Sequence, residues 1–147
     1  MTLSSRTAVA IHTLTKLAQH GQDQLLTSAE IADSLNGNPV AVRRILGQLR
    51  SAGLVESTEG YGGGWRLSRP ARQISLYDAY AAVEPGPVLA GHTHPPNPGC
   101  VIGRHITTLL HSEFSAAETA LQRRLSRTSI AAIHRSILDL ETEAEQA

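Results

Sequence analysis

Residues 27–69 have the sequence TSAEIADSLNGNPVAVRRILGQLRSAGLVESTEGYGGGWRLSR, and this stretch decides the fold. A helix is predicted to begin after Asn38, a good capping residue, with Pro39 at the first helical position, where no N–H is needed. Apolar residues at i, i+3, i+4 and i+7 predict one buried face, made of Val42, Ile45, Leu46 and Leu49. The opposite face carries Arg43, Gly47 and Arg50, with Arg44 and Gln48 at its edge. The predicted helix therefore presents arginine outward.

A shorter helix is predicted directly before it. Thr27 and Glu30 form a capping-box pattern, in which the Thr27 hydroxyl accepts from the Glu30 N–H and the Glu30 carboxylate reaches back. Asn36 and Gly37 tolerate positive φ and end this helix. A short helix, a tight turn and a second helix with exposed arginines predict a helix-turn-helix, whose second helix enters the DNA major groove.

A β-hairpin is predicted next. Residues 54–58 and 65–68 have the composition of strands, and residues 59–64 form a glycine-rich turn between them. A glycine-rich hairpin alone, or exposed arginine alone, is common without any nucleic acid. The ordered combination favours a winged helix-turn-helix that binds DNA.

Length and composition agree with a small, mainly helical protein. The 147 residues suit one domain, and aromatic residues are only 3%, so the core must consist of Leu, Ile, Val and Ala. No apolar run approaches the ~20 residues needed to span a bilayer, and no secretory pattern is present, so we expect no membrane association and a cytoplasmic location. The formal net charge is zero, yet residues 43–72 hold six arginines and two glutamates, a local charge of +4 suited to steering DNA.

The remaining segments complete a mainly α fold with a small β wing. They are expected to be a helix at 5–20, a short helix capped by Ser75, a loop rich in proline and glycine at 85–99, and a long helix from about 102 to 125. Thr128 is predicted to cap a last helix whose tail frays. The predicted units are a DNA-binding domain at 1–84, a sensor loop at 85–100, and a dimerisation helix with a C-terminal helix at 101–147.

The long helix carries more apolar positions than one small domain can cover. Because it would extend roughly 35 Å, we expect it to pack against the same helix of a second copy. The alternative is that it covers only its own domain. The predicted dimerisation residues are Ile102, Ile106, Leu109, Leu110, Phe114, Ala117, Leu121 and Leu125.

Four motifs resemble one known family. They are GLVES at 53–57, GGGWRL at 62–67, RPA at 69–71 and ISLYDAYAAVE at 74–84. On these motifs, and over nearly the whole chain, the sequence closely resembles the Rrf-two family of bacterial transcription regulators, the family of the iron–sulfur regulator IscR and the nitric-oxide-sensing repressor NsrR. The resemblance implies a dimeric winged-helix DNA-binding protein, dimerised through the long helix near Cys100, with the recognition helix in the major groove and the wing in the minor groove.

The helix-turn-helix pattern and the resemblance together predict the residues that contact DNA. They are Thr27, Ser28, Asn38, Val40, Arg43, Arg44, Gly47, Arg50, Tyr61, Gly62, Gly63 and Arg66. The wing tip departs from the family, since Glu59 stands where an arginine is frequent. Because phosphates repel a carboxylate, we expect the wing contact to depend on Tyr61, Arg66 and the loop backbone.

Cys100 is the single cysteine and matches the third of three cysteines that bind an iron–sulfur cluster in many family members. Such a cluster needs more thiolates, so we expect no cofactor and a likeness to single-cysteine members such as YwnA. At a helix start, Cys100 is either a redox or electrophile sensor or an inert cap. His92, His94 and His105 have the right types for a zinc or iron site with Cys100, but such histidines are usually only exposed, and no metal site is predicted.

The leading hypothesis is a homodimeric, sequence-specific regulator that acts as a repressor on a pseudo-palindromic site in double-stranded DNA. One alternative is a regulator that responds to a ligand or metal through the 85–100 loop. A second is an interaction dimer without DNA binding, which Glu59 and the zero net charge favour. A third is an enzyme with Cys100 as nucleophile and His94 or His105 as base, but no oxyanion or phosphate-binding motif accompanies them, so no enzyme is predicted.

Overall fold

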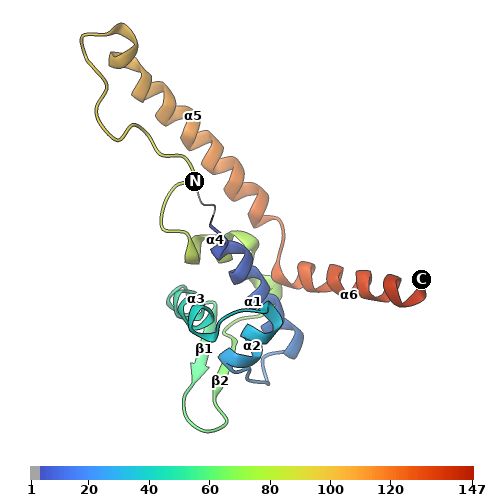
Figure 1. Cartoon of the computed structure of the whole chain (residues 1–147). Coiled ribbons are helices and arrows are strands. Elements are labelled where there is room, and N and C mark those ends of the chain that lie inside the picture. The colour runs from blue at the N-terminus through green and yellow to red at the C-terminus, as the bar shows by residue number, and fades with distance from the viewer. Residues whose placement is uncertain (1–3) are drawn as a thin grey trace.

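The computed structural model describes residues 4–147 and is mainly α-helical with one two-stranded antiparallel sheet, as predicted (Figure 1). Within these residues, every helix is too short or too polar to span a lipid bilayer. The elements in chain order are α1 (Arg6–His20), α2 (Ser28–Leu35), α3 (Pro39–Ser51), β1 (Val55–Thr58), β2 (Gly64–Leu67), the 3-10 turn η1 (Ala71–Gln73), α4 (Leu76–Val83), α5 (Val101–Ser126) and α6 (Ile130–Gln146).

An aliphatic core joins α1, α2, α3 and α4 to the two strands. Each fully buried aliphatic side chain contributes about 1.5–3 kcal/mol of transfer free energy, which allows folding without a large aromatic core. Ile130, the first residue of α6, also belongs to this core and so anchors the C-terminal helix. The fully buried side chains include Leu14, Leu17, Ile31, Leu46, Leu49, Leu54, Ile74 and Val83.

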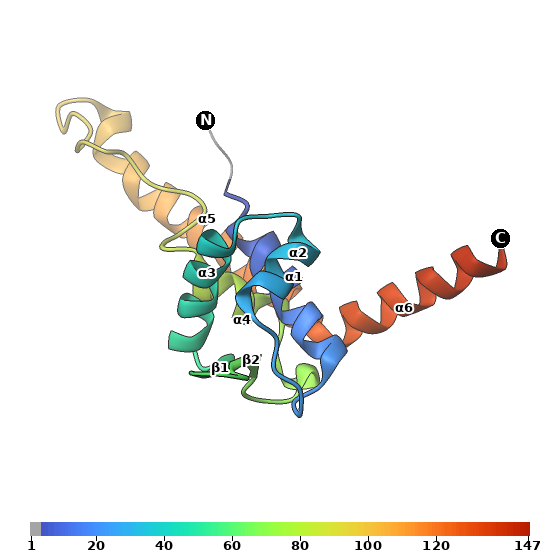
Figure 2. The same ribbon diagram turned by 60° about the horizontal axis from the view of Figure 1, so that its bottom comes forward.

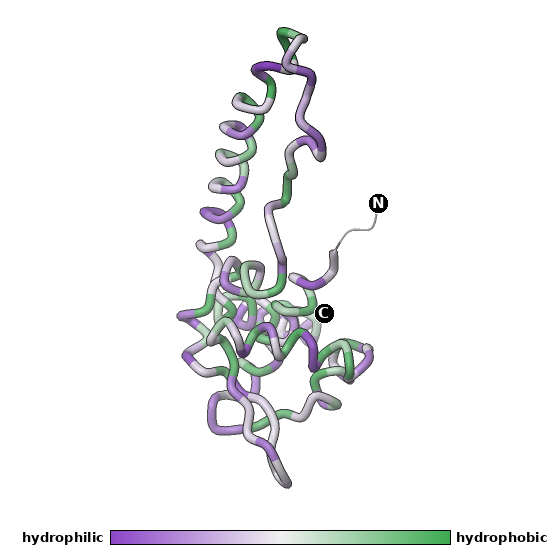
Figure 3. Tube along the Cα trace, turned by 90° about the vertical axis from the view of Figure 1, so that its left-hand side faces the viewer, coloured by the Kyte–Doolittle hydropathy of each residue, from purple (hydrophilic) through white to green (hydrophobic). Residues whose placement is uncertain are grey.

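The loop at 85–99 and α5 project together from this body. Figures 1 and 3 show the loop running away from the body alongside α5. Helix α5 then runs back to the body, and α6 extends from there in another direction. None of the 26 residues of α5 is buried, although a helix of that length measures about 39 Å. The core therefore leaves α5 largely uncovered.

Two expectations for the last helix are wrong. Ser129, not Thr128, caps α6, because Ser129 Oγ accepts from the Ala132 N–H at 3.0 Å. Thr128 is held outside the helix by long-range pairing, since its carbonyl oxygen accepts from the Leu76 N–H at 2.9 Å. The helix also continues to the penultimate residue instead of fraying. The turn η1 has no counterpart in the sequence prediction.

Candidate DNA-binding interface

The helix-turn-helix has the local geometry that its sequence predicts. The capping box of α2 is complete: the Glu30 N–H donates to Thr27 Oγ1 at 3.1 Å, and the Thr27 N–H donates to Glu30 Oε2 at 2.8 Å. Asn36 ends α2 in the left-handed conformation, with φ of 50°. The Thr27 oxygen accepts this cap bond, and the O–H hydrogen of the same hydroxyl can still donate to an acceptor on DNA.

Helix α3, the predicted recognition helix, turns its apolar side into the core and its polar side outward. Asn38 Oδ1 accepts from the Val40 N–H at 2.8 Å, and all four predicted apolar residues are buried. Val40 is 57% exposed. Arg43 and Arg44 are exposed, and among residues 4–147 neither guanidinium pairs with a carboxylate. Gly47 leaves open space where a side chain would stand, so the outward face is flat at its middle.

Arg50 joins the end of α3 to the wing, the hairpin of residues 55–67. Figure 2 shows the two strands of the wing next to the end of α3. Its guanidinium carbon lies 5.2 Å from the centre of the Trp65 ring, and its Nη1 donates to Ser57 Oγ at 3.0 Å. Arg50 is exposed but held by these contacts, so it is less free than Arg43 to reach DNA.

The base of the wing is fastened to the segment before α2. The Trp65 N–H donates to the Leu26 carbonyl at 2.8 Å, and the Leu26 N–H donates back at 3.0 Å. Trp65 Nε1–H donates to Ser28 Oγ at 3.2 Å, and Ser28 is only 9% exposed. A Cβ at Gly64 would lie 2.6 Å from the Leu26 oxygen, so this close pairing requires glycine. Ser28 thus supports the wing from inside, and the DNA contact predicted for it stays a prediction.

The tip of the wing is open to solvent. Gly60 and Gly62 adopt positive φ values of 89° and 77°, and the Tyr61 side chain between them is fully exposed to solvent. A Cβ at Gly63 would collide with the Thr58 carbonyl oxygen, so this position also requires glycine. Arg66 lies in the strand behind the tip, where its Nε pairs with Glu56 Oε1 at 2.6 Å. This ion pair offsets the charge of Arg66, one of the residues on which the wing contact was expected to depend.

Cys100 precedes α5 and is exposed. The backbone N–H groups of Gly103, and then of Ile102, in the first turn of α5 hold the pKa of the Cys100 thiol below its ordinary value. A Cβ at Gly103 would collide with the Asn97 carbonyl oxygen, so glycine lets the loop close over the first turn of α5. The sequence prediction overlooked this role of Gly103, although the spacing from Cys100 is a usable signal.

The predicted dimerisation residues divide between two environments. Leu110 and Phe114 line a cavity of about 560 Å³ against Pro87 and Leu89 of the loop. Ile102 and Leu109 stand open on α5, 69% and 64% exposed. The remaining predicted positions are half-buried at Ile106, Leu121 and Leu125 and exposed at Ala117.

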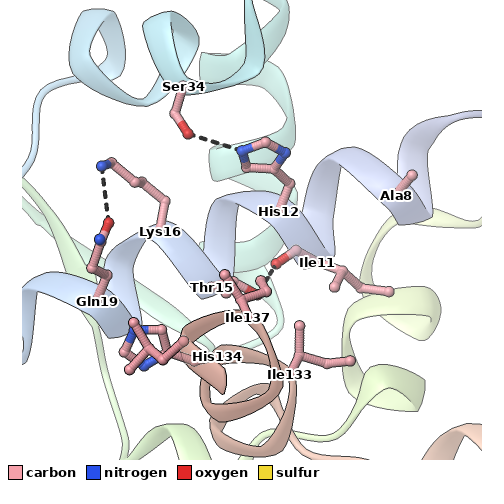
Figure 4. Close-up of a pocket in the computed structure, with 11 residues that line it drawn as sticks. Ala8, Ile11, His12, Thr15, Lys16, Gln19, Ser34, Ile133, His134 and Ile137 are labelled. Atoms are coloured by element: carbon pink, nitrogen blue, oxygen red, sulfur yellow. Dashed lines mark hydrogen bonds between the residues drawn. The ribbon is translucent and has the colours of Figure 1, made fainter. Parts of the chain in front are cut away.

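A groove of about 560 Å³ separates α1 from α6 (Figure 4). Its lining is mostly apolar, with Ile11 and Ile133 facing each other across it. His12 lies at one side and shares a 2.9 Å hydrogen bond with Ser34 Oγ. Beyond the groove, Leu140 of α6 is 64% exposed. The sequence prediction did not identify this groove.

Comparison with known proteins identifies the family. A sequence model named Rrf2, described as an iron-dependent transcriptional regulator, matches residues 3–136. The chain belongs to the Rrf2 family. It is therefore a DNA-binding transcriptional regulator and not an enzyme.

Individual relatives support the assignment to the Rrf2 family and the fold. The HTH-type transcriptional regulator YwnA of Bacillus subtilis (strain 168) is 36% identical over 128 residues, covering 87% of this chain and 93% of YwnA. The solved structure of a transcriptional regulator from Lactobacillus plantarum has a TM-score of 0.75 at 24% identity, covering 99% of this chain and 100% of that one. T. potens IscR has a TM-score of 0.68 at 20% identity, covering 93% and 88%. Both solved structures have the same fold as this chain.

The iron in the family's description does not fit the residues of this member. Iron–sulfur clusters are held mainly by several cysteine thiolates, and this chain has one cysteine. Among residues 4–147, no three His, Cys, Asp or Glu side chains come together as a metal site requires, so His92, His94 and His105 do not gather around Cys100.

Proposed function

We propose that this Rrf2-family regulator is a homodimeric repressor that recognises a pseudo-palindromic DNA site. The observation that supports this proposal most strongly is the exposed side of α3, which presents Val40, Arg43 and Arg44 outward beside the wing. Arginine attracts phosphates and reads base edges. A two-fold dimer favours half-sites about one or two helical turns apart. Bound at a promoter, such a dimer represses most simply by excluding the polymerase.

The exposed side of α5 supports the dimer. Ile102 and Leu109 are both more than half exposed on a helix with no buried residue. Exposed apolar surface of this kind marks interaction sites in soluble proteins. A second copy presenting the same surface would cover both residues at once.

The double variant Arg43→Ala/Arg44→Ala tests the DNA-reading role. Each lost phosphate contact is expected to lower the slope of log K against log salt by about one. The control is Arg104→Ala/Arg135→Ala, which removes two exposed arginines from α5 and α6. If the α3 variant retains the wild-type affinity and slope, α3 is not the DNA reader.

We propose Cys100 as the site of a thiol switch. Its exposure and lowered pKa favour the thiolate, which a peroxide oxidises by transferring one oxygen atom to sulfur and leaving as water. Peroxide is expected to weaken DNA binding of the wild type and not of Cys100→Ser. Equal sensitivity in the variant would contradict the switch and favour a ligand in the cavity between the loop and α5.

A further inference from the structure

We propose that Arg6, at the start of α1, joins Arg44 in a second phosphate-binding site on the flank of α3 opposite the wing. The site rests on the proposed DNA-binding role of α3. It extends the contact surface to a residue outside both the helix-turn-helix and the wing.

A concave surface of about 450 Å³ separates α3 from the start of α1 and the end of α4. Arg6 and Arg44 both line it, together with the polar side chains of Ser5, Asn38 and Gln48. Arg6 and Arg44 are exposed at its rim, while buried Val42 and half-buried Val9 and Leu35 lie among its apolar lining.

The lining of this surface carries two positive charges and no negative one, although the Glu84 carboxylate lies beside it. None of its lining residues is acidic. Glu84 is next in sequence to the lining residues Val83 and Pro85, but its Oε1 accepts from Ser4 Oγ at 2.9 Å and Thr7 Oγ1 at 3.0 Å. Within residues 4–147, no carboxylate pairs with Arg6 or Arg44. Two unpaired guanidinium groups on one concave surface suit an anion, because arginine binds phosphate oxygens through paired N–H donors.

The position of the surface identifies the anion. Figure 1 shows the wing below α3 and the start of α1 with α4 above it. A helix in the major groove, about 12 Å wide, has a sugar–phosphate backbone on each side. Arg50 contacts the wing on one flank, whereas Arg44 lines the surface on the other. The N-terminus of α3 adds a positive dipole end there, although Pro39 has no N–H and the Val40 N–H already donates to Asn38 Oδ1.

Arg6→Ala tests the site by fluorescence anisotropy on operator and non-operator DNA at several salt concentrations. The slope of log K against log salt is expected to fall by about one per protomer. The affinity for operator DNA and the affinity for non-operator DNA are expected to fall by the same factor, because phosphate contacts carry no sequence information. Arg6→Lys keeps the charge and is expected to keep the slope. Arg104→Ala removes an exposed arginine from α5 and is expected to change nothing.

The outcomes separate this site from the proposed function. An unchanged slope in Arg6→Ala, with salt-dependent binding by the wild type, overturns the site and leaves the α3 role intact. A loss confined to operator DNA, or an equal loss of slope in Arg6→Lys, overturns the phosphate assignment. Absence of salt-dependent binding by the wild type overturns both proposals.

Discussion

At the scale of single residues, the chemistry of Cys100 depends on Gly103. The Gly103 N–H is the main group that lowers the pKa of the thiol, and its missing side chain lets Asn97 lie over the helix start. The sequence indicates a helix start at Cys100 but not these contacts, because they depend on how the irregular loop folds back.

The pH dependence of Cys100 alkylation tests this contact. Because the folded backbone stabilises the thiolate, the alkylation rate is expected to rise at lower pH in the native protein than in the same protein unfolded in urea. Gly103→Ala is expected to move the native profile toward the unfolded one, since its Cβ would displace the first turn. Superimposable native and unfolded profiles would show that the thiol is not activated.

At the scale of elements, local signals are sufficient where the contacts are local. The caps of α2 and α3 depend on residues within three positions, and the sequence predicts both correctly. The start of α6 depends instead on pairing between residues 74–76 and 128–130, which no local pattern reveals. The wing is predicted as a hairpin, but its attachment to Leu26 and Ser28 is also long-range.

Gly64→Ala tests that attachment. Its added Cβ would press on the Leu26 carbonyl, and forced overpacking typically lowers the free energy of unfolding by about 1–3 kcal/mol. Gly86→Ala is the matched control, because its Cβ would meet open space. Urea unfolding followed by Trp65 fluorescence measures both. Equal stability of the two variants would mean that the wing is not held at Gly64.

At the scale of the whole molecule, periodicity alone does not separate the two sides of α5. Leu110 and Phe114 share the predicted stripe with Ile106, yet the loop faces them. Ile102 and Leu109 are the more exposed side chains. The loop lacks any repeating pattern, so its course beside α5 could not be predicted from the sequence.

Leu109→Glu tests the dimer. A carboxylate placed in an apolar interface would lose its hydration, so the variant is expected to sediment as a monomer at concentrations where the wild type is a dimer. Its affinity for a full pseudo-palindrome should fall toward that for one half-site. Thr108→Glu, at the neighbouring exposed position, is the control. A dimeric Leu109→Glu variant would place the interface elsewhere.

The central claim is sequence-specific DNA binding, and one anisotropy experiment tests it most directly. The reduced protein is titrated into DNA from upstream of its own gene and into shuffled DNA of equal composition, at several salt concentrations. We expect the upstream DNA to bind at least about 10³-fold more tightly, with log K falling linearly as log salt rises. Equal affinity for the two DNAs, or binding that salt does not weaken, would contradict the claim.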